Sequence, residues 1–242
     1  METRSYDYEL NIACELARAA GAAILEHYEG PLHIKQKNYD DDAEPVTQAD
    51  TIANELIVTG LKREFPDDGI LAEDGKCILG VVYQPLTGVL YRAVQGGGTW
   101  IERPQFEPEQ AKVSDKKAIS DMRLAASRSH RSPRMNKVVT RFGFQDEVQR
   151  GSVGIKIGLL VEQQCDVYIH LSSRTKQWDT CAPEIILTEA GGRITDLFGY
   201  PLSYNVPDVQ NRNGLVASNG ISHDQIIETL APLLNEFGRK RA

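Results

Sequence analysis

The chain has 242 residues, of which 41% are hydrophobic and 25% charged, and its formal net charge at pH 7 is −7. This length suits one large domain with a sizeable core. An acidic chain of ordinary composition has no electrostatic footprint for nucleic-acid polymers or membrane surfaces, so neither is expected as a partner. Because no apolar run could span a bilayer and the N-terminus lacks an apolar signal core, we expect a cytoplasmic protein.

Apolar residues at helical spacing predict two helices in the first part of the chain, over Tyr6–Tyr28 and from about Thr47 to Phe65. Gly30-Pro31 ends the first helix, and a strand and an acidic loop separate it from the second. Cys77–Gln84 and Val89–Val94 alternate apolar and polar residues around a Pro-Leu-Thr-Gly turn, which predicts a β-hairpin.

A turn at Gly96–Gly98 and a polar loop precede an alternation of strands and helices. The expected strands are Arg123–Ser127, Asp166–Leu171, Arg193–Asp196 and Gly214–Ser218, and the expected helices are Val153–Gln163, Thr180–Ala190 and His223–Phe237. Gly191-Gly192 stops the second of these helices. The alternation predicts a layered α/β fold.

The cysteines form no C-x-x-C pair, so the sequence does not suggest a zinc site. They are Cys14, Cys77, Cys165 and Cys181. In a cytoplasmic protein we expect all four to be reduced thiols. The basic C-terminal residues Gly238–Ala242 are expected to be solvated.

Two acidic residues stand at expected helix starts, Asp50 and Asp179, and a third, Glu73, follows a turn. Each has an ordinary explanation: Thr47-x-x-Asp50 fits a capping box, Asp179 can cap its helix, and Glu73 can be a solvated loop residue. Together they fit another explanation. Carboxylates are the ligands that Mg²⁺ prefers, and two such ions can activate water against a phosphate ester.

Two further segments are suited to phosphate. Gly151–Lys156 places small residues at a helix start and a lysine one turn in, although it could equally be a glycine-started helix with a surface lysine. Ser127–Arg131 supplies hydroxyls, two arginines and a histidine, which suits a phosphate or nucleotide sugar but also an ordinary basic surface loop.

Taken together, these segments resemble the inositol monophosphatase family, and within it the 3'(2'),5'-bisphosphate nucleotidases. The longest match runs from Gln177-Trp178-Asp179-Thr180-Cys181-Ala182-Pro183 to Asp196. Shorter matches occur in the family's order at Pro45–Asp50, Phe65–Glu73, Gly80–Pro85, Ser127–His130 and Gly151–Lys156. The resemblance covers nearly the whole chain.

The resemblance implies an αβαβα sandwich and Mg²⁺-dependent, commonly lithium-inhibited hydrolysis of a phosphate monoester. It implies a single phosphatase domain over 1–242, with a metal-binding half at 1–120 and a substrate-binding half at 121–242. Family members often form homodimers. Carried over by position, Asp50 helps to hold a metal and activates water, Glu73 and Asp179 are metal ligands, and Ser127, His130, Ser152 and Lys156 contact a nucleoside monophosphate.

The chain departs from the family at its centre. The motif Asp-Pro-(Ile/Leu)-Asp-Gly-Thr, which carries two metal-binding carboxylates, is absent, and the chain runs directly through Leu71–Cys77. Glu73-Asp74 is either the family's acidic pair or part of the next turn. Three explanations compete: the sequence omits a central segment near 71–77, the chain is a shortened or alternatively processed form, or it is a degenerate family member.

We favour the omitted segment, because the flanks are intact. It predicts a Cα–Cα separation within Leu71–Cys77 that far exceeds the roughly 3.8 Å of a trans peptide. The expected substrate is then a small phosphorylated metabolite, 3'-phosphoadenosine 5'-phosphate first and inositol monophosphate second. The competing class is a catalytically inactive member that binds a ligand or a protein.

Overall fold

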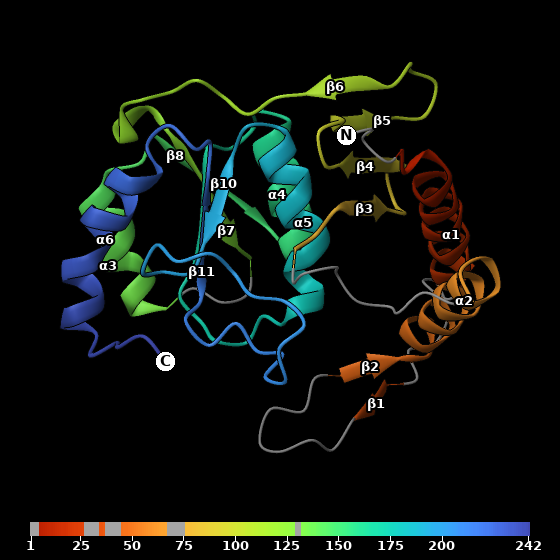
Figure 1. Cartoon of the computed structure of the whole chain (residues 1–242). Coiled ribbons are helices and arrows are strands. Elements are labelled where there is room, and N and C mark those ends of the chain that lie inside the picture. Colours follow the sequence, from red (N-terminus) through yellow and green to blue (C-terminus); the bar gives the residue numbers. More distant parts are fainter. Residues whose placement is uncertain (1–4, 27–33, 37–44, 67–75, 129–131) are drawn as a thin grey trace.

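The computed structural model describes residues 5–26, 34–36, 45–66, 76–128 and 132–242, with side chains left out at 34–36 and 45–47. Five layers succeed one another across the molecule: α3 and α6, a five-stranded sheet, α4 and α5, a four-stranded sheet, and α1 with α2 (Figure 1). The expected αβαβα sandwich is therefore confirmed. The prediction about Leu71–Cys77 concerns residues that lie mostly outside the described ranges.

The helices are α1 (Asp7–Glu26), α2 (Gln48–Glu64), α3 (Pro133–Phe142), α4 (Val153–Val161), α5 (Gln177–Glu189) and α6 (His223–Glu236), with a 3-10 turn, η2 (Ile119–Asp121). The strands are β1 (Ile34–Gln36), β2 (Pro45–Thr47), β3 (Leu79–Gln84), β4 (Val89–Val94), β5 (Gly98–Glu102), β6 (Glu109–Ala111), β7 (Arg123–Ser127), β8 (Asp146–Arg150), β9 (Val167–His170), β10 (Arg193–Thr195) and β11 (Leu215–Ser218).

The two large sheets differ in topology. β3, β4, β5 and β6 form an antiparallel meander, and its first hairpin closes between Gln84 and Val89 as expected. The other sheet has the order β10-β11-β9-β7-β8, in which β7 runs parallel to both β8 and β9. Its two faces are covered by helices, so its central strands are almost wholly apolar.

Three apolar clusters hold the layers together. The largest lies between the two sheets, where α4 and α5 contribute Ile157, Leu160 and Ile186, each about 1% exposed. A second joins the five-stranded sheet to α3 and α6, and includes Leu124 and Ile226. A third and smaller cluster lies under α1. The layered order therefore follows from which face of each element is apolar.

The strand β3 and the helix α5 approach each other unusually closely at Gly80. A Cβ built on Gly80 would lie 2.8 Å from the carbonyl oxygen of Ala182 and 2.9 Å from its Cα. These are backbone atoms, so neither can move aside by a side-chain rotation.

We predict that Gly80→Ala lowers the free energy of unfolding by about 1–3 kcal/mol. Urea denaturation measures it, and Gly151→Ala, whose Cβ would meet nothing within 4 Å, is the matched control. Equal midpoints would refute the close approach.

His223 is a buried histidine at the start of α6. Its Nδ1 lies 2.8 Å from Ser218 Oγ and its Nε2 lies 2.9 Å from Thr195 Oγ1. Burial, reinforced by the charge of Arg193, lowers the pKa of the imidazole from 6.5 to about 4. Between these values the unfolded chain binds a proton that the folded chain does not, so stability falls as the pH falls.

We therefore predict that the free energy of unfolding decreases by about 2–3 kcal/mol from this group between pH 7 and pH 4.5. Urea unfolding at both pH values, compared with His223→Gln, isolates the contribution. The substitution should flatten the pH dependence by that amount. An unchanged pH dependence would contradict a depressed pKa at His223.

Sequence reasoning overlooked the helix α3, the 3-10 turn η2 and the strands β2, β5, β6 and β8. For α3 the signals were present. Ser132 Oγ accepts a hydrogen bond from Met135 N at 3.2 Å, Pro133 occupies the first turn, and Gly143 ends the helix with φ 62°. The strand β8, in contrast, is a polar edge strand whose residues are exposed or half-buried, so it has no apolar pattern to detect.

One smaller expectation was wrong. Cys77 and Cys181 are joined in a disulfide, whereas the sequence predicted reduced thiols; the fold brings together two residues that are far apart in the chain. The C-terminal residues 238–242 are mostly exposed, as expected, but Arg241 also contacts the domain. The Arg241 guanidinium pairs with Asp196 at 3.2 Å and lies 3.8 Å from the Tyr200 ring centroid. No described helix is long and apolar enough to cross a membrane.

Candidate active site

The parallel strands gather most of the candidate residues of the C-terminal half at one edge. Because β7 is parallel to β8 and β9, the carboxyl ends of all three strands point the same way. Ser127 is the last residue of β7, Gly151-Ser152 directly follow β8, and the segment after β9 leads into α5. Ligands of open α/β sheets bind beyond the carboxyl ends of such strands.

Lys156 lies one turn into α4 and is buried, with 4% of its surface exposed. It is therefore not the surface lysine of the simpler explanation. Its ammonium donates to the backbone oxygen of Ser152 at 3.1 Å and lies 4.7 Å from the ring centroid of Tyr168 on β9. Burial lowers the pKa of Lys156 to about 8, so its charge is only partly held at alkaline pH.

Tyr168 connects the lysine to the acidic residue of the site. It is 1% exposed, and its hydroxyl has no hydrogen-bond partner among the described residues. Its pKa is raised by burial and, to a smaller extent, by the negative charge of Asp179. The Lys156 ammonium thus lies near the ring of a tyrosine that also senses the charge of Asp179, although Lys156 and Asp179 are 23 positions apart in the sequence. Sequence reasoning missed Tyr168, since it reads only as a buried strand residue.

Asp179 lies in the first turn of α5, which begins at Gln177, three residues earlier than predicted. Its Oδ2 accepts a hydrogen bond from the backbone N–H of Lys176 at 2.8 Å, so the expected capping role is confirmed. The residue is only half-buried. The capping hydrogen bond uses one oxygen of the carboxylate, Oδ2. The residue itself lies at the border between the protein and solvent.

A loop running from Tyr204 to Asn211 anchors this turn of α5. The Asn211 side-chain amide donates to Lys176 O at 3.1 Å and to Thr180 Oγ1 at 3.3 Å. The Tyr204 hydroxyl donates to Glu184, and burial raises the pKa of that carboxyl. These buried polar contacts fix the position of the helix start and hence of Asp179. No local sequence pattern marks them, because the partners come from a distant loop.

The other candidate residues are less well defined. Asp50 lies in the first turn of α2, as expected, and is exposed. Glu73 and His130 lie outside the described residues. Across the described ranges, no three His, Cys, Asp or Glu side chains come close enough to hold a metal ion.

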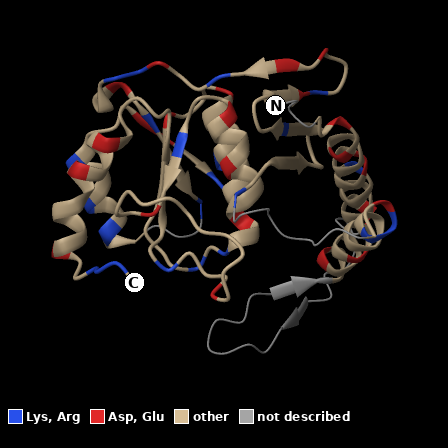
Figure 2. Ribbon diagram, viewed as in Figure 1, with Lys and Arg blue, Asp and Glu red and all other residues tan. Residues whose placement is uncertain are grey.

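Acidic and basic residues are interspersed along the helices and loops (Figure 2). The formal net charge of the whole chain is −7. An anionic ligand would therefore be attracted by local groups such as Lys156 and not by the overall field.

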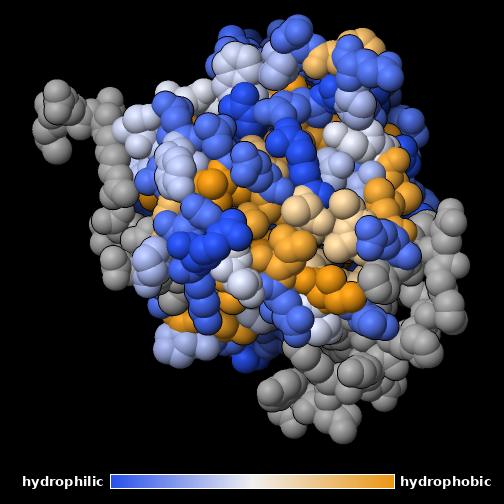
Figure 3. All heavy atoms as spheres, turned by 90° about the vertical axis from the view of Figure 1, so that its right-hand side faces the viewer, coloured by the Kyte–Doolittle hydropathy of each residue, from blue (hydrophilic) through white to orange (hydrophobic). Residues whose placement is uncertain are grey.

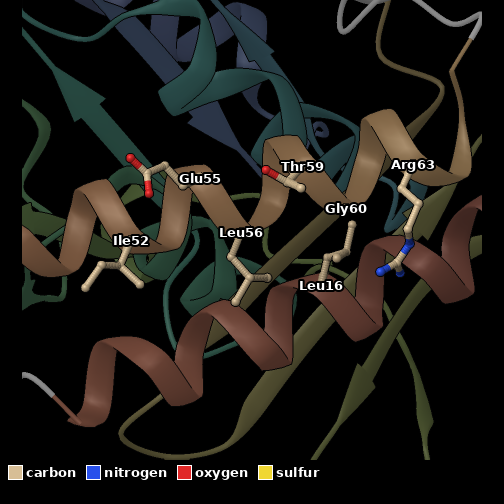
Figure 4. Close-up of a pocket in the computed structure, with 7 residues that line it drawn as sticks. All are labelled: Leu16, Ile52, Glu55, Leu56, Thr59, Gly60 and Arg63. Atoms are coloured by element: carbon tan, nitrogen blue, oxygen red, sulfur yellow. The ribbon is translucent and has the colours of Figure 1, made fainter.

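A hollow between α1 and α2 is separate from these residues. It has a volume of about 420 Å³ and is lined by Leu16, Ile52, Glu55, Leu56, Thr59, Gly60 and Arg63. Apart from Leu16, the lining side chains come from α2 (Figure 4). Figure 3, which faces this side of the molecule, shows hydrophobic side chains gathered near its centre. None of the candidate residues lines the hollow, so we do not place the site there.

Comparison with known proteins defines the class. The model of the inositol monophosphatase family matches residues 5–76 and 71–235. The chain therefore belongs to the inositol monophosphatase family. The match is in two pieces that meet at residues 71–76, which is the place where the sequence lacks the family's central motif.

Individual relatives are phosphatases by name. The chain is 28% identical to the 3'(2'),5'-bisphosphate nucleotidase CysQ of Escherichia coli strain K12, over 81% of this chain and 93% of that protein. It is 32% identical to inositol monophosphatase 3 of Xenopus tropicalis, over 71% of this chain and 47% of that protein.

Solved structures support the fold. The IMPase TM1415 of Thermotoga maritima matches with a TM-score of 0.78 and 20% identity, covering 95% of this chain and 99% of the other. CysQ from Bacteroides thetaiotaomicron matches with a TM-score of 0.69 and 24% identity, covering 88% and 97%.

Proposed function

We propose that the chain hydrolyses a small phosphate monoester in a Mg²⁺-dependent reaction, with 3'-phosphoadenosine 5'-phosphate as the first candidate substrate and inositol monophosphate as the second. One observation carries the proposal: the Lys156 ammonium lies 4.7 Å from the ring of Tyr168, a residue whose pKa is also raised by the charge of Asp179. The segments that carry these residues adjoin the carboxyl ends of three parallel strands. A cation and a carboxylate at such an edge suit a phosphate and its counter-ion. The ranking of substrates follows from the relatives that carry the nucleotidase name.

In this proposal the chain's own groups bind and orient the substrate. The Lys156 ammonium, with the hydroxyls of Ser127 and Ser152 and the side chain of His130, holds the nucleoside monophosphate part. Asp50 accepts a proton from the attacking water. Residues 121–242 thus supply the substrate contacts, and residues 1–120 supply part of the metal site.

The metal remains part of the proposal. The carboxylates of Asp50 and Asp179 have the oxygen chemistry that Mg²⁺ prefers, and Glu73 would add a third. The described residues alone do not assemble a complete ligand set. When bound, Mg²⁺ would supply positive charge against the phosphate and lower the pKa of a bound water.

A second function is favoured by a different observation. The family match is divided into two pieces at residues 71–76, and a chain that truly lacks the central carboxylates would be an inactive member that binds a ligand or a protein.

A measurement of phosphate release distinguishes the two functions. With Mg²⁺, we expect release from 3'-phosphoadenosine 5'-phosphate to exceed release from inositol monophosphate, and lithium to inhibit both. Binding of these compounds, seen by calorimetry, without any release would support the inactive member.

A further inference from the structure

The disulfide between Cys77 and Cys181 ties together two parts of the chain that meet at α5. The two residues are 104 positions apart, and their Cα atoms lie 5.9 Å from each other. Cys77 lies just before β3, and Cys181 lies in α5, two residues after Asp179. Both residues are half-buried, so part of each remains exposed to solvent.

The other two cysteines are expected to be unreactive toward thiols and disulfides. Cys14 and Cys165 are free and buried. Burial raises the pKa of Cys14 to about 11 and that of Cys165 to about 12. Since the thiolate is the reactive form, neither is a competent partner in exchange at neutral pH. Thiol chemistry in this chain is therefore confined to the pair.

The surrounding structure holds the pair close even without the bond. Three residues after Cys77, Gly80 lies against Ala182, the residue next to Cys181, so closely that a Cβ would meet backbone atoms. β3 is also fixed by its pairing with β4, in which Gly80 lies opposite Ala93. Two thiols kept at such a contact have a high effective concentration, so the bond can break and re-form within one folded molecule.

We propose that Cys77 and Cys181 form a reversible thiol–disulfide site that exchanges with small thiols and disulfides. The bond determines how firmly the first turn of α5, which carries Asp179, is held against β3. The site operates in this way whether or not the chain hydrolyses phosphate esters.

A small thiol supplies the two electrons that reduce the Cys77–Cys181 disulfide. The thiolate of the reagent attacks one sulfur of the bond, forms a mixed disulfide and releases the other sulfur as a thiolate, which takes up a proton. A second reagent thiol then displaces the first, leaving two protein thiols and one reagent disulfide. Oxidation is the reverse: a small-molecule disulfide accepts two electrons and leaves as two thiols.

The first test counts thiols in the native protein. Full-length protein is equilibrated with glutathione buffers of increasing oxidised fraction, quenched with acid, unfolded, alkylated and weighed intact. We expect four alkylations in reducing buffer, since the chain has four cysteines, and a single reversible step to about two in oxidising buffer. Cys14→Ala should lose one alkylation in each state and keep the step. Four alkylations throughout, or only glutathione adducts, would overturn the proposal.

The second test measures the anchoring of α5. Hydrogen exchange of the amides in Gln177–Glu184 should be about 10-fold slower in the oxidised protein than in the reduced one, with α3 and α6 unchanged. Cys181→Ser in oxidising buffer should match the reduced wild type. Cys77→Ser provides the same comparison if the first variant does not fold. Equal exchange in the oxidised and reduced protein would refute a role in anchoring.

Discussion

We predict that replacing Asp179 by asparagine lowers the rate of phosphate release by about 1,000-fold, or roughly 4 kcal/mol, and leaves the fold intact. Asparagine keeps an oxygen that can accept the Lys176 N–H bond now made at 2.8 Å, so the helix cap survives. It removes the negative charge that a hard cation requires. The measurement is kcat with saturating Mg²⁺, together with thermal unfolding.

A matched control is Asp208→Asn. Asp208 is an exposed carboxylate in the loop that anchors α5, and it pairs with Arg212 at the surface. Its loss removes the same charge from the same region but touches no proposed ligand, so activity should stay within about threefold. Near-equal activities of the two variants would show that Asp179 is only a helix cap.

The second large effect is expected at Lys156. Lys156→Met keeps the length of the buried side chain and removes its ammonium. We predict that the KM for the phosphate monoester rises about 100-fold, because a charge-assisted contact to phosphate is lost. Stability should not fall, since burying an ammonium costs free energy that methionine does not. Lys137→Met, at an exposed position on α3, is the control.

The same variant tests the pH dependence. With a pKa of about 8, Lys156 is charged below that pH and neutral above it. The kcat/KM of the wild type should therefore decline as the pH rises through about 8, and the decline should be absent in Lys156→Met. An unchanged KM together with a preserved alkaline decline would exclude Lys156 from phosphate binding.

The sequence located most of the layers because their cores are apolar in a regular pattern. The strand Arg123–Ser127 was predicted with its observed bounds, and the helix of Val153–Val161 with its observed start. The strand Asp146–Arg150 could not be found in this way, because an edge strand that is exposed or half-buried has no apolar period. Because this strand was not predicted, the parallel arrangement that brings the candidate site residues together was not predicted either.

The site was predictable only in part. Asp179 and Lys156 were identified from short segments at helix starts, and the structure relates both of them to Tyr168. The supporting groups were invisible in the sequence, because Tyr204 and Asn211 reach the start of α5 from a loop about 25 to 30 residues further on. The pairing of Cys77 with Cys181 was missed for the same reason: it depends on tertiary packing between β3 and α5.

The most direct test of the proposed activity is phosphate release from 3'-phosphoadenosine 5'-phosphate by the folded wild-type chain, with Mg²⁺ or with excess EDTA. We predict release with Mg²⁺ that EDTA abolishes and that added Mg²⁺ restores. No release above the uncatalysed rate, from this ester or from inositol monophosphate, by protein that unfolds cooperatively would contradict the phosphatase and leave the inactive family member.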